Sequence, residues 1–447
     1  MYILTNGRLI TRDPDAKGYY EKGAVVYEGS KIVEVGEEAA LTAKYPQAER
    51  IDARGGVIMP AFINAHTHIY SALARGLSIV GNNPTNFFEV LDGTWWAIDR
   101  HLTLEGTRAS ADALYIDCIK QGVTTIFDHH ASYCQIPGSL FQIGESAKKF
   151  GIRSCLCYEV SDRDGEEKCL EAIQENADWI TYCQEHKDPM LAAMFGGHAL
   201  FTISDKTFDR MVAANNGRTG YHIHVSEGMN DVYDSLQNYG RRPVQRLQDH
   251  GILGGKTILG HCIHVNTAEM EIIKETGTMV VNNPESNMGN AIGICPVLQL
   301  HKRGILLGMG TDAYTNDMLE SLKVALCSQR SQNCLPNVGW CEVTDMLFKN
   351  NAKIGAKYFP DQLGVLKAGA AADIIVMDYK PFTPFSDENI DGHMIFGMTG
   401  RQCQTTIAAG KLLMKDRELV GIDEEAENAH ILEASKKLWG NLNHREY

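Results

Sequence analysis

Short apolar runs recur through the middle of the chain, separated by longer segments with helical periodicity. One such segment, PGSLFQIGESAKKFG, spaces its apolar residues three and four apart and ends in glycine, which is typical of a helix. Eight strand–helix repeats over roughly 250 residues are the pattern of a (β/α)8 barrel. We therefore predict an α/β fold built on a TIM barrel, with strands at residues 57–64, 124–128, 153–159, 191–197, 220–224, 257–260, 279–281 and 305–310.

Both ends of the chain instead have the pattern of short strands joined by tight turns. MYILTNGRLIT and GAVVYEGSKIVEVG alternate around turns near the start, as CQTTIAAGKLLMKDREL does near the end. We predict that residues 1–55 and 364–447 together form a small β-sandwich domain with a C-terminal helix, and that residues 56–363 form the barrel. A doubly wound open sheet is the main alternative, but no G-x-G-x-x-G loop follows the first barrel strand.

Composition narrows the class of protein. The net charge of −14 leaves no basic stripe for phosphates, so we expect no nucleic-acid partner. No run approaches 18 apolar residues, and the N-terminus lacks the pattern of a signal peptide, so we expect no membrane association. The 12 cysteines include no C-x-x-C pair, which argues against a zinc knuckle. We expect a cytoplasmic protein.

Histidines gather at the predicted carboxyl ends of four strands. A single His-x-His pair would be weak evidence, because chance produces such pairs readily. Barrel enzymes place their chemistry at this face, however, so polar residues that collect there indicate an active site. Eight of the 16 histidines do so: His66 and His68, His129 and His130, His222 and His224, and His261 and His264.

Three of these histidines and one aspartate form the predicted metal site. His66 and His68 end the first strand, His224 ends the fifth, and Asp312 follows the eighth. Three imidazoles and a carboxylate, with water completing the shell, suit one divalent ion, either zinc or the alternative iron(II). We predict zinc, and we expect His222 to support the site from behind rather than to bind the ion.

Acid–base chemistry is expected beside this ion. Glu227 lies three residues after His224, where its carboxylate can reach both a metal-activated hydroxide and a substrate; an exposed loop glutamate is the alternative. His261 is predicted to polarise the substrate or to hold the hydroxide. Asp312 is predicted to share in proton removal. The predicted catalytic residues are therefore Glu227, His261 and Asp312.

The motifs in their order resemble those of the amidohydrolase superfamily. They read PAFINAHTH, HIHVSE, LGHCIHV, NNPESNMG and LGMGTDA, and the resemblance extends over essentially the whole chain. GVTTIFDHH and NNPESNMG resemble the branch of aminated-heterocycle deaminases and triazine hydrolases, and CYEVSDRDG and DGTWWAIDRHLT resemble aminohydrolases of the SsnA type. The resemblance implies the same four metal ligands and the same catalytic Glu227 and His261, and it implies a homo-oligomer, expected to be a dimer.

The resemblance also bears on the number of ions. Binuclear relatives bridge two ions with a carboxylated lysine at the end of strand four, where this chain has LAAMFGGHALFT and offers His198 instead. A single ion is therefore expected. The chain departs from its relatives at Ala61, where they often carry glycine, and at Asn282, where they often carry histidine, so substrate contacts near Asn282 are in doubt.

The substrate is expected to be a small heterocyclic molecule held by loops after the strands. Trp95 and Trp96 can stack on a planar ring or fill an ordinary helix core, and Glu159, Asp162 and Arg163 can bind the ring or form surface charge. The full set of predicted contacts is His129, His130, Trp95, Trp96, Glu159, Arg163, His198 and Asn287.

These features predict a metal-dependent amidohydrolase that acts on carbon–nitrogen bonds other than peptide bonds. The leading hypothesis is hydrolytic deamination of an aminated N-heterocycle, purine- or pterin-like, with release of ammonia. Hydrolytic ring opening of a cyclic amide is the second hypothesis. A relative that binds metal or ligand without turnover is the third, although pure ligand capture needs no proton carrier such as Glu227.

Overall fold

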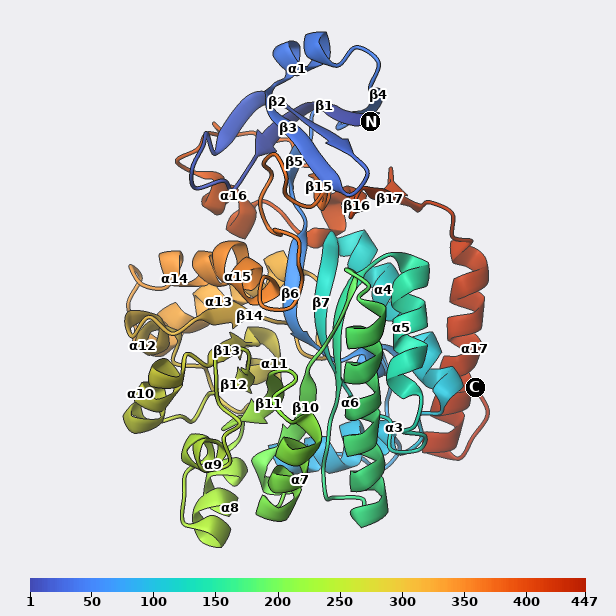
Figure 1. Cartoon of the computed structure of the whole chain (residues 1–447), viewed down its shortest axis with the longest axis vertical. Helices are drawn as coiled ribbons and strands as arrows, with labels where there is room; N and C mark the ends of the chain where they lie inside the picture. Colours follow the sequence, from blue (N-terminus) through green and yellow to red (C-terminus); the bar gives the residue numbers. More distant parts are fainter.

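The structure is a computed structural model that describes residues 1–447. A small β-sheet layer lies at one end of the molecule, above a larger body of parallel strands surrounded by helices (Figure 1). The strands of this larger body are β6 (Phe62–Thr67), β7 (Val123–His130), β8 (Arg153–Tyr158), β9 (Leu191–Ala193), β10 (Phe195–Ala199), β11 (Tyr221–Val225), β12 (Ile258–His261), β13 (Met279–Asn282) and β14 (Leu307–Met309).

These strands form two parallel sheets that meet edge to edge. One sheet has the order β6-β7-β8-β9 and the other the order β10-β11-β12-β13-β14. Isolated bridges join the sheets at both seams, from Val160 to Gly197 and from Thr67 to Asp312, so the strands close into a barrel. The fourth predicted strand is divided into β9 and β10, and a Cβ on Gly196 in β10 would lie only 2.2 Å from the Tyr158 carbonyl oxygen. Glycine therefore permits the close approach of β10 to β8.

Helices that follow the strands cover the outside of the barrel. Among them, α4 (Leu104–Gln121) is capped by Thr103, whose side chain accepts from the Gly106 N–H, and ends at Gly122 with φ of 78°. None of the helices is long and apolar enough to cross a bilayer. The others are α1 (Glu38–Lys44), α2 (Phe87–Val90), α3 (Trp96–Asp99), α5 (Ser139–Phe150), α6 (Glu166–His186), α7 (Asp205–Asn215), α8 (Met229–Tyr239), α9 (Pro243–Asp249), α10 (Thr267–Thr276), α11 (Pro284–Gly289), α12 (Val297–Lys302), α13 (Met318–Asn333), α14 (Trp340–Asp345), α15 (Asn351–Gly355), α16 (Ile390–Phe396) and α17 (Glu424–Asn443).

The small layer is one nine-stranded sheet that combines both chain ends. Its order is β18-β17-β16-β15-β5-β1-β2-β3, with β4 paired to β1. Hydrogen bonding connects all nine strands, and a sandwich of two packed sheets stays a prediction. The strands are β1 (Tyr2–Ile10), β2 (Tyr19–Glu28), β3 (Lys31–Glu37), β4 (Glu49–Asp52), β5 (Val57–Pro60), β15 (Ile374–Met377), β16 (Cys403–Ala408), β17 (Lys411–Lys415) and β18 (Glu418–Leu419).

The apolar run at residues 57–64 serves both layers. Its first part is β5, which pairs with β1 and β15 in the small sheet, whereas its second part begins β6 of the barrel. The expectation of one barrel strand here was wrong, because continuous hydrophobicity does not reveal a change of partner at Ala61. The chain therefore enters the barrel directly from the small sheet.

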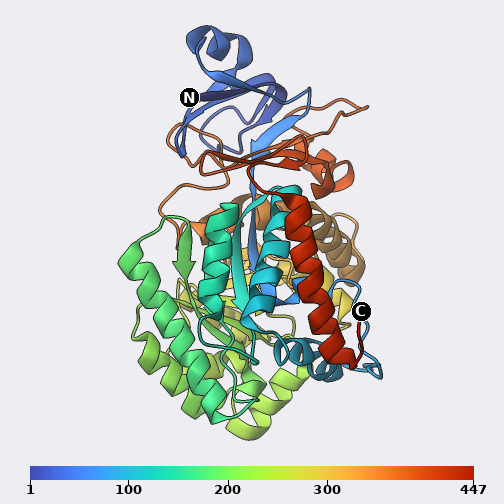
Figure 2. The same cartoon turned by 90° about the vertical axis from the view of Figure 1, so that its right-hand side faces the viewer.

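The C-terminal helix α17 lies against the barrel, not against the small sheet. It runs alongside α4 in both views (Figures 1 and 2). The Trp439 indole N–H donates to the Leu73 carbonyl oxygen at 2.8 Å, and the Asn443 side chain contacts the backbone of Ser78 and Val80. The helix thus holds the start of the long connection that follows β6.

A buried ion pair joins the base of the barrel to the small sheet. The Arg153 guanidinium, fully buried at the start of β8, donates to Asp373, which directly precedes β15. Asp373 also accepts from the Thr124 hydroxyl at 3.0 Å and from the Ala409 N–H at 2.7 Å. One carboxylate therefore holds two barrel strands and one sheet turn together.

This arrangement predicts a large loss of stability on removal of the carboxylate. Asp373→Ala leaves the buried Arg153 with only the more distant Asp361 carboxylate, 3.8 Å away, so we expect the free energy of unfolding to fall by about 3–5 kcal/mol. Denaturant unfolding followed by circular dichroism measures this change. Lys17→Ala, which removes an exposed ion pair with Glu37, is the control and should leave the midpoint unchanged. Equal midpoints for both variants would contradict the assignment.

Candidate active site

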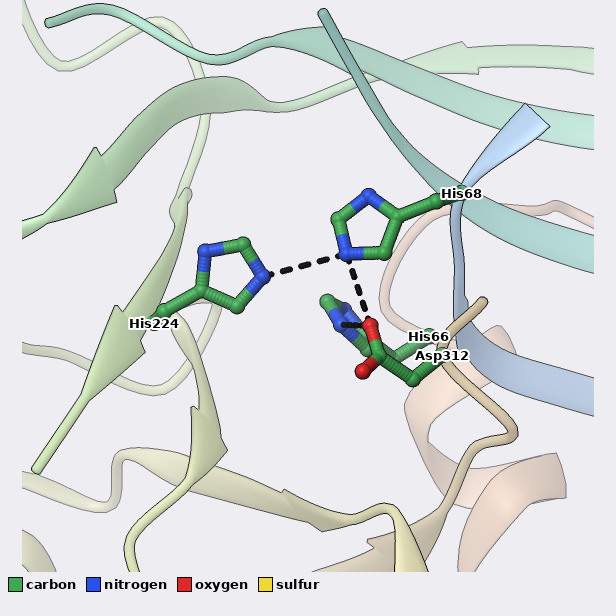
Figure 3. A group of neighbouring side chains, drawn as sticks. All are labelled: His66, His68, His224 and Asp312. Carbon is green, nitrogen blue, oxygen red and sulfur yellow. Dashed lines mark hydrogen bonds and ion pairs between the residues drawn. The ribbon is translucent and has the colours of Figure 1, made fainter. Parts of the chain in front are cut away.

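Four side chains from three separate parts of the barrel converge at its carboxyl-terminal face (Figure 3). They are His66 of β6, His68 directly after β6, His224 of β11 and Asp312, which follows β14. His68 Nε2 lies 2.7 Å from Asp312 Oδ1 and 3.2 Å from His224 Nε2, and His66 Nε2 lies 3.2 Å from the same carboxylate oxygen. All four ligand atoms lie within 4.8 Å of one another. The predicted ligand set is therefore brought together in one buried cluster.

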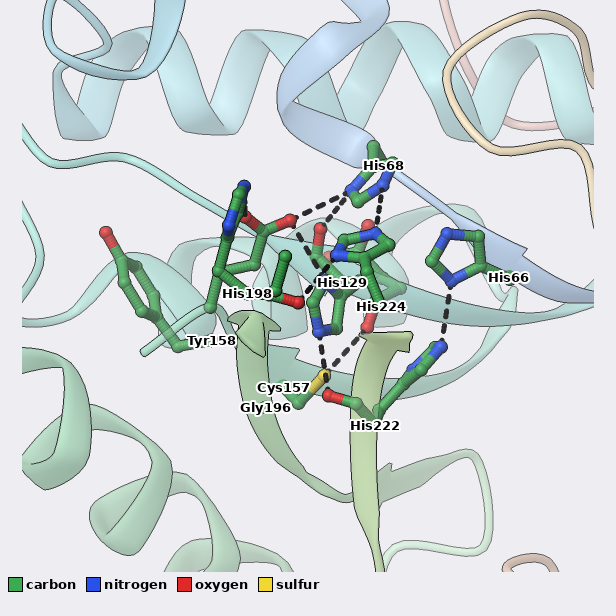
Figure 4. A network of polar contacts seen from close by, with 12 residues as sticks. His66, His68, His129, Cys157, Tyr158, Gly196, His198, His222 and His224 are labelled. Carbon is green, nitrogen blue, oxygen red and sulfur yellow. Dashed lines mark hydrogen bonds and ion pairs between the residues drawn. The ribbon is translucent and has the colours of Figure 1, made fainter. Parts of the chain in front are cut away.

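Backbone carbonyl groups of neighbouring strands orient two of these imidazoles (Figure 4). His68 Nδ1 lies 2.5 Å from the His129 carbonyl oxygen, and His224 Nδ1 lies 2.9 Å from the His198 carbonyl oxygen. Because a carbonyl oxygen only accepts, each Nδ1 carries a proton, and each Nε2 is the atom that faces the cluster. The two Nε2 atoms are thus the ones that would bind an ion at the centre of the cluster, where on His68 the ion would replace a proton.

The third imidazole is oriented by another histidine. His66 Nδ1 lies 2.8 Å from His222 Nε2, and the rings meet edge to face. If His66 uses Nε2 toward the cluster, its Nδ1–H donates and His222 accepts. His222 is therefore placed behind the cluster, in the supporting position that the sequence predicts.

Burial and charge set the protonation of the cluster. Burial lowers the pKa of His66 to about 3 and holds the pKa of His224 well below its ordinary value, so both rings are neutral. Burial also lowers the pKa of His68, but the Asp312 carboxylate outweighs burial and raises it to about 10. Burial raises the pKa of Asp312, yet the facing His68 and His66 hold it well below its ordinary value.

This donor set fits a divalent transition-metal ion. Imidazole nitrogens with oriented rings, together with an ionised carboxylate, are the ligands that zinc and iron(II) take in proteins, and on His68 the ion would replace the proton that Asp312 stabilises. No lysine lies at the end of β10, whose sequence is FGGHA. The cluster therefore resembles a site for one ion.

Left-handed backbone turns aim several of these side chains inward. Ser226, His261, Cys262 and Asp312 have φ between 50° and 68°, a region that residues other than glycine rarely adopt. The Ser226 N–H donates to Asp231 of α8 at 2.7 Å, which holds the turn that carries Glu227. Strained turns of this kind are common at active sites, where surrounding hydrogen bonds maintain them.

Glu227 and His261 lie beside Asp312 and complete a second group. His261 Nε2 lies 3.6 Å from Glu227 Oε1. The three residues each place one nitrogen or carboxylate oxygen within 4.8 Å of the other two. His261 Nδ1 lies 2.7 Å from the Asn287 amide oxygen, so its Nε2 keeps a lone pair toward Glu227. Burial, and then the Asp312 carboxylate, raise the pKa of Glu227 well above its ordinary value. The site thus combines a carboxyl group whose pKa is raised with an imidazole whose Nε2 lone pair faces it.

Ser286 is a functional residue that the sequence reasoning missed. Its hydroxyl donates to Asp312 Oδ2, the carboxylate oxygen turned away from the histidines. Ser286 and Asn287 lie on α11, whose sequence PESNMG belongs to a motif already noted for its resemblance to relatives. The motif was the available signal, but the partner of its serine is set by tertiary structure.

Three of the predicted substrate contacts line a cavity above the cluster. Trp95, Glu159 and His198 lie on its wall, together with Glu227 and with residues that the sequence reasoning missed. Burial raises the pKa of Glu159, but His129 and His198 outweigh it and lower the pKa below its ordinary value. The missed wall residues are Tyr70, Phe87, Leu91, Asn290 and Ala313.

Two other predicted substrate contacts, His129 and Arg163, are engaged by neighbouring protein groups. Both ring nitrogens of His129 face protein acceptors, Glu159 Oε1 at 2.9 Å and the His222 carbonyl oxygen at 2.8 Å. Arg163 donates to the buried Asp99, and its guanidinium lies 4.1 Å from the centre of the Tyr133 ring.

Hydrogen bonds with the protein also engage the other predicted contacts. The Trp96 indole donates to His198, His130 Nε2 pairs with the Ser132 hydroxyl, and Asn287 pairs with His261. Asp162 accepts from the start of α7. Trp96, His130, Asn287 and Asp162 do not line the cavity.

Comparison with known proteins identifies the family. Residues 57–413 match the amidohydrolase family, and residues 23–48 match the imidazolonepropionase-like composite domain of bacteria. The chain belongs to the amidohydrolase family, as the sequence motifs predict.

Individual relatives narrow the branch. A 5'-deoxyadenosine deaminase from Methanosarcina mazei is 30% identical over 99% of both chains. A 5-methylthioadenosine/S-adenosylhomocysteine deaminase from Thermococcus sibiricus is 31% identical over 88% of this chain and 90% of the relative. Among solved structures, an adenosine deaminase from Xanthomonas campestris with bound zinc shares the fold, with a TM-score of 0.82, 22% identity and 98% of each chain covered.

The position of His222 predicts an indirect effect on metal binding. His222→Leu removes the acceptor that orients His66, so we expect metal affinity to fall about 10–100-fold without loss of the fold. Competition with a chromogenic chelator measures the affinity. His250→Ala, which removes a histidine that pairs with Asp205 and Asp209, is the control. Unchanged affinity in His222→Leu would show that His66 needs no such support.

Proposed function

We propose that this protein is a metal-dependent aminohydrolase that releases ammonia from an aminated N-heterocycle, purine- or pterin-like. The observation that carries the proposal is the group of Glu227, His261 and Asp312 directly beside the metal-ligand cluster. Relatives that match nearly the whole chain bear the names of adenosine-derivative deaminases, which supports this reaction over others of the family.

The residues proposed to hold the ion are His66, His68, His224 and Asp312. Zinc is the proposed metal, with iron(II) as the alternative, and the zinc bound by the structural neighbour supports this choice. When bound, a divalent ion supplies Lewis acidity, which lowers the pKa of water into the neutral range. The lack of a lysine at the end of β10 supports a single ion.

The proposed proton carrier is Glu227. Its raised pKa favours the protonated carboxyl group, which can give its proton to a ring nitrogen or to the departing amine. His261, fixed by Asn287, presents its Nε2 lone pair and is proposed to position the attacking water. Asp312, held by Ser286 at one oxygen and by histidines at the other, is proposed to accept a proton from that water.

The cavity wall is proposed to bind the heterocycle. Trp95 and Tyr70 meet edge to face with ring centres 6.4 Å apart, and Phe87 and Leu91 add apolar surface. Such a wall suits a planar ring. Glu159 and His198 are the proposed polar contacts from the opposite strands.

Ring opening of a cyclic amide remains the second candidate, because the same groups can activate water for attack on a carbonyl carbon. Ammonia separates the two reactions, since ring opening changes ultraviolet absorbance without releasing it. A binding protein without turnover is the third candidate, and the paired Glu227 and His261 argue against it.

We also propose the division of the chain into a β domain of residues 1–55 and 364–447 and a barrel of residues 56–363. The shared nine-stranded sheet supports this division, although α17 packs on the barrel. A homodimer, a cytoplasmic location and the absence of a nucleic-acid partner are proposed from the family resemblance and the charge of −14.

Neutralising Glu227 should separate binding from turnover. Glu227→Gln keeps the size of the side chain but cannot carry the proton, so we expect kcat to fall about 10²–10⁴-fold while metal content stays constant. Ammonia release with an adenine nucleoside and elemental analysis provide the two readouts. Glu145→Gln, on the exposed face of α5, is the control. Full activity in Glu227→Gln would remove the proposed proton carrier.

Removing the ion should abolish activity reversibly. Prolonged dialysis against a chelator is expected to reduce turnover to background, because water then keeps its ordinary pKa. Adding about one equivalent of zinc or iron(II) should restore activity. An ammonia screen across purines, pterins, pyrimidines and triazines then identifies the substrate. Activity that survives complete metal removal would refute the proposal.

A further inference from the structure

Glu159 is the buried carboxylate on the cavity wall that the proposed chemistry does not use. It follows β8 directly, is 1% exposed and lies among the side chains of His129, His68 and His198. Its Oε1 is 2.9 Å from His129 Nδ1 and 3.3 Å from His68 Nδ1. Its Oε2 accepts no hydrogen bond from the protein and lies 3.7 Å from His198 Nε2.

The hydrogen bonds around His129 determine whether Glu159 Oε2 is a hydrogen-bond donor or acceptor. His129 Nε2 faces the His222 carbonyl oxygen, which only accepts, so Nε2 carries a proton. One further proton then lies between His129 Nδ1 and Glu159 Oε1. Whichever of these two atoms holds it, Glu159 Oε2 is left as a hydrogen-bond acceptor.

His198 contributes no donor to this part of the wall. Its Nδ1 lies 3.1 Å from the Thr202 hydroxyl, whose own proton goes to the Ala199 carbonyl oxygen, so His198 Nδ1 donates. Its Nε2 is therefore a lone pair, and it accepts from the Trp96 indole at 3.3 Å. The side of the cavity formed by Glu159 and His198 thus offers the free acceptor Glu159 Oε2 and no donor (Figure 4 labels His198 and His129).

Apart from His68 and the ion that it is proposed to bind, the cavity wall carries no cation. None of the residues that line the cavity is lysine or arginine. Arg163, the cation predicted to face the substrate, is engaged by Asp99 and packs on Tyr133. A carboxylate or phosphate placed beside Glu159 would therefore meet the acceptor Oε2 without a lysine or arginine partner.

We propose that Glu159 determines substrate specificity: its Oε2 binds an N–H or O–H donor of an uncharged or cationic substrate and disfavours substrates that carry a carboxylate or phosphate group. The donor is either a ring N–H of a free base or a hydroxyl of a nucleoside. This inference rests on the proposed function for its choice of heterocycle, and it distinguishes between substrate types that the proposed reaction alone would accept equally.

Equilibrium binding tests the inference without turnover. Purine, 9-methylpurine, purine riboside and purine riboside 5'-phosphate lack an amino group, and their affinity for the zinc-loaded full chain is measurable by calorimetry. We expect purine or its riboside to bind about 10–100-fold more tightly than 9-methylpurine, which has neither donor. A preference for purine assigns the donor to the ring, and a preference for the riboside assigns it to a hydroxyl. The 5'-phosphate should bind at least about tenfold more weakly than the riboside.

The variant Glu159→Gln sharpens the test. Its amide oxygen can keep the contact with His129 Nδ1, which places an N–H₂ donor where Oε2 stood. Both affinity ratios should then fall by at least about tenfold, because the wall now offers a donor to acceptors and anions. Glu175→Gln is the matched control: Glu175 is also buried, but it accepts from the Gly138 and Leu140 N–H groups away from the cavity. It should preserve both ratios.

Two results would overturn the inference. One is equal binding of all four ligands to the wild-type protein, which needs no variant. The other is a pair of ratios unchanged in Glu159→Gln that retains its fold and its zinc. A separate ammonia assay with aminated purines tests the proposed function, so a protein that releases no ammonia yet shows the ratios would refute the reaction and support the role of Glu159.

Discussion

The register between neighbouring barrel strands is the constraint on which the site depends. The His68 ring is oriented by the backbone carbonyl of His129 on β7, and the His224 ring by that of His198 on β10. The fixed spacing of parallel strands places each carbonyl beside the imidazole of its neighbour. A slip of one residue would turn each ring away from the centre, so the barrel itself sets the tautomers of the cluster.

Placing so many polar groups inside the barrel requires each to have a partner. His66 is paired with His222, Asp312 with Ser286, and His261 with Asn287. These contacts come from strands and loops that are far apart in sequence. They also hold the left-handed turns in place, because a strained turn persists only when its surroundings determine it fully. The chemistry of the cluster is thus a property of the assembled barrel.

The sequence predicts the barrel, the four-residue metal cluster and the placement of Glu227, because periodicity and strand-end position determine these features locally. The sequence prediction fails where a tertiary contact with another part of the chain determines the position of a side chain or strand. Arg163 was expected to face the substrate, but Asp99 from a distant helix engages it. The run at residues 57–64 was read as one strand, since hydrophobicity cannot show that β5 joins the small sheet. The role of Ser286 and the packing of α17 likewise depend on contacts that no local pattern encodes.

The closing seam of the barrel gives the cluster an order of assembly. Asp312 bridges to Thr67, and its backbone N–H donates to the His66 carbonyl oxygen at 3.0 Å. The first and last strands therefore meet at residues that are proposed to hold the ion. Asp312 is synthesised after the other three residues of the cluster. The complete ligand set can therefore form only after the last barrel strand has been added, and binding of the proposed ion would follow closure of the barrel.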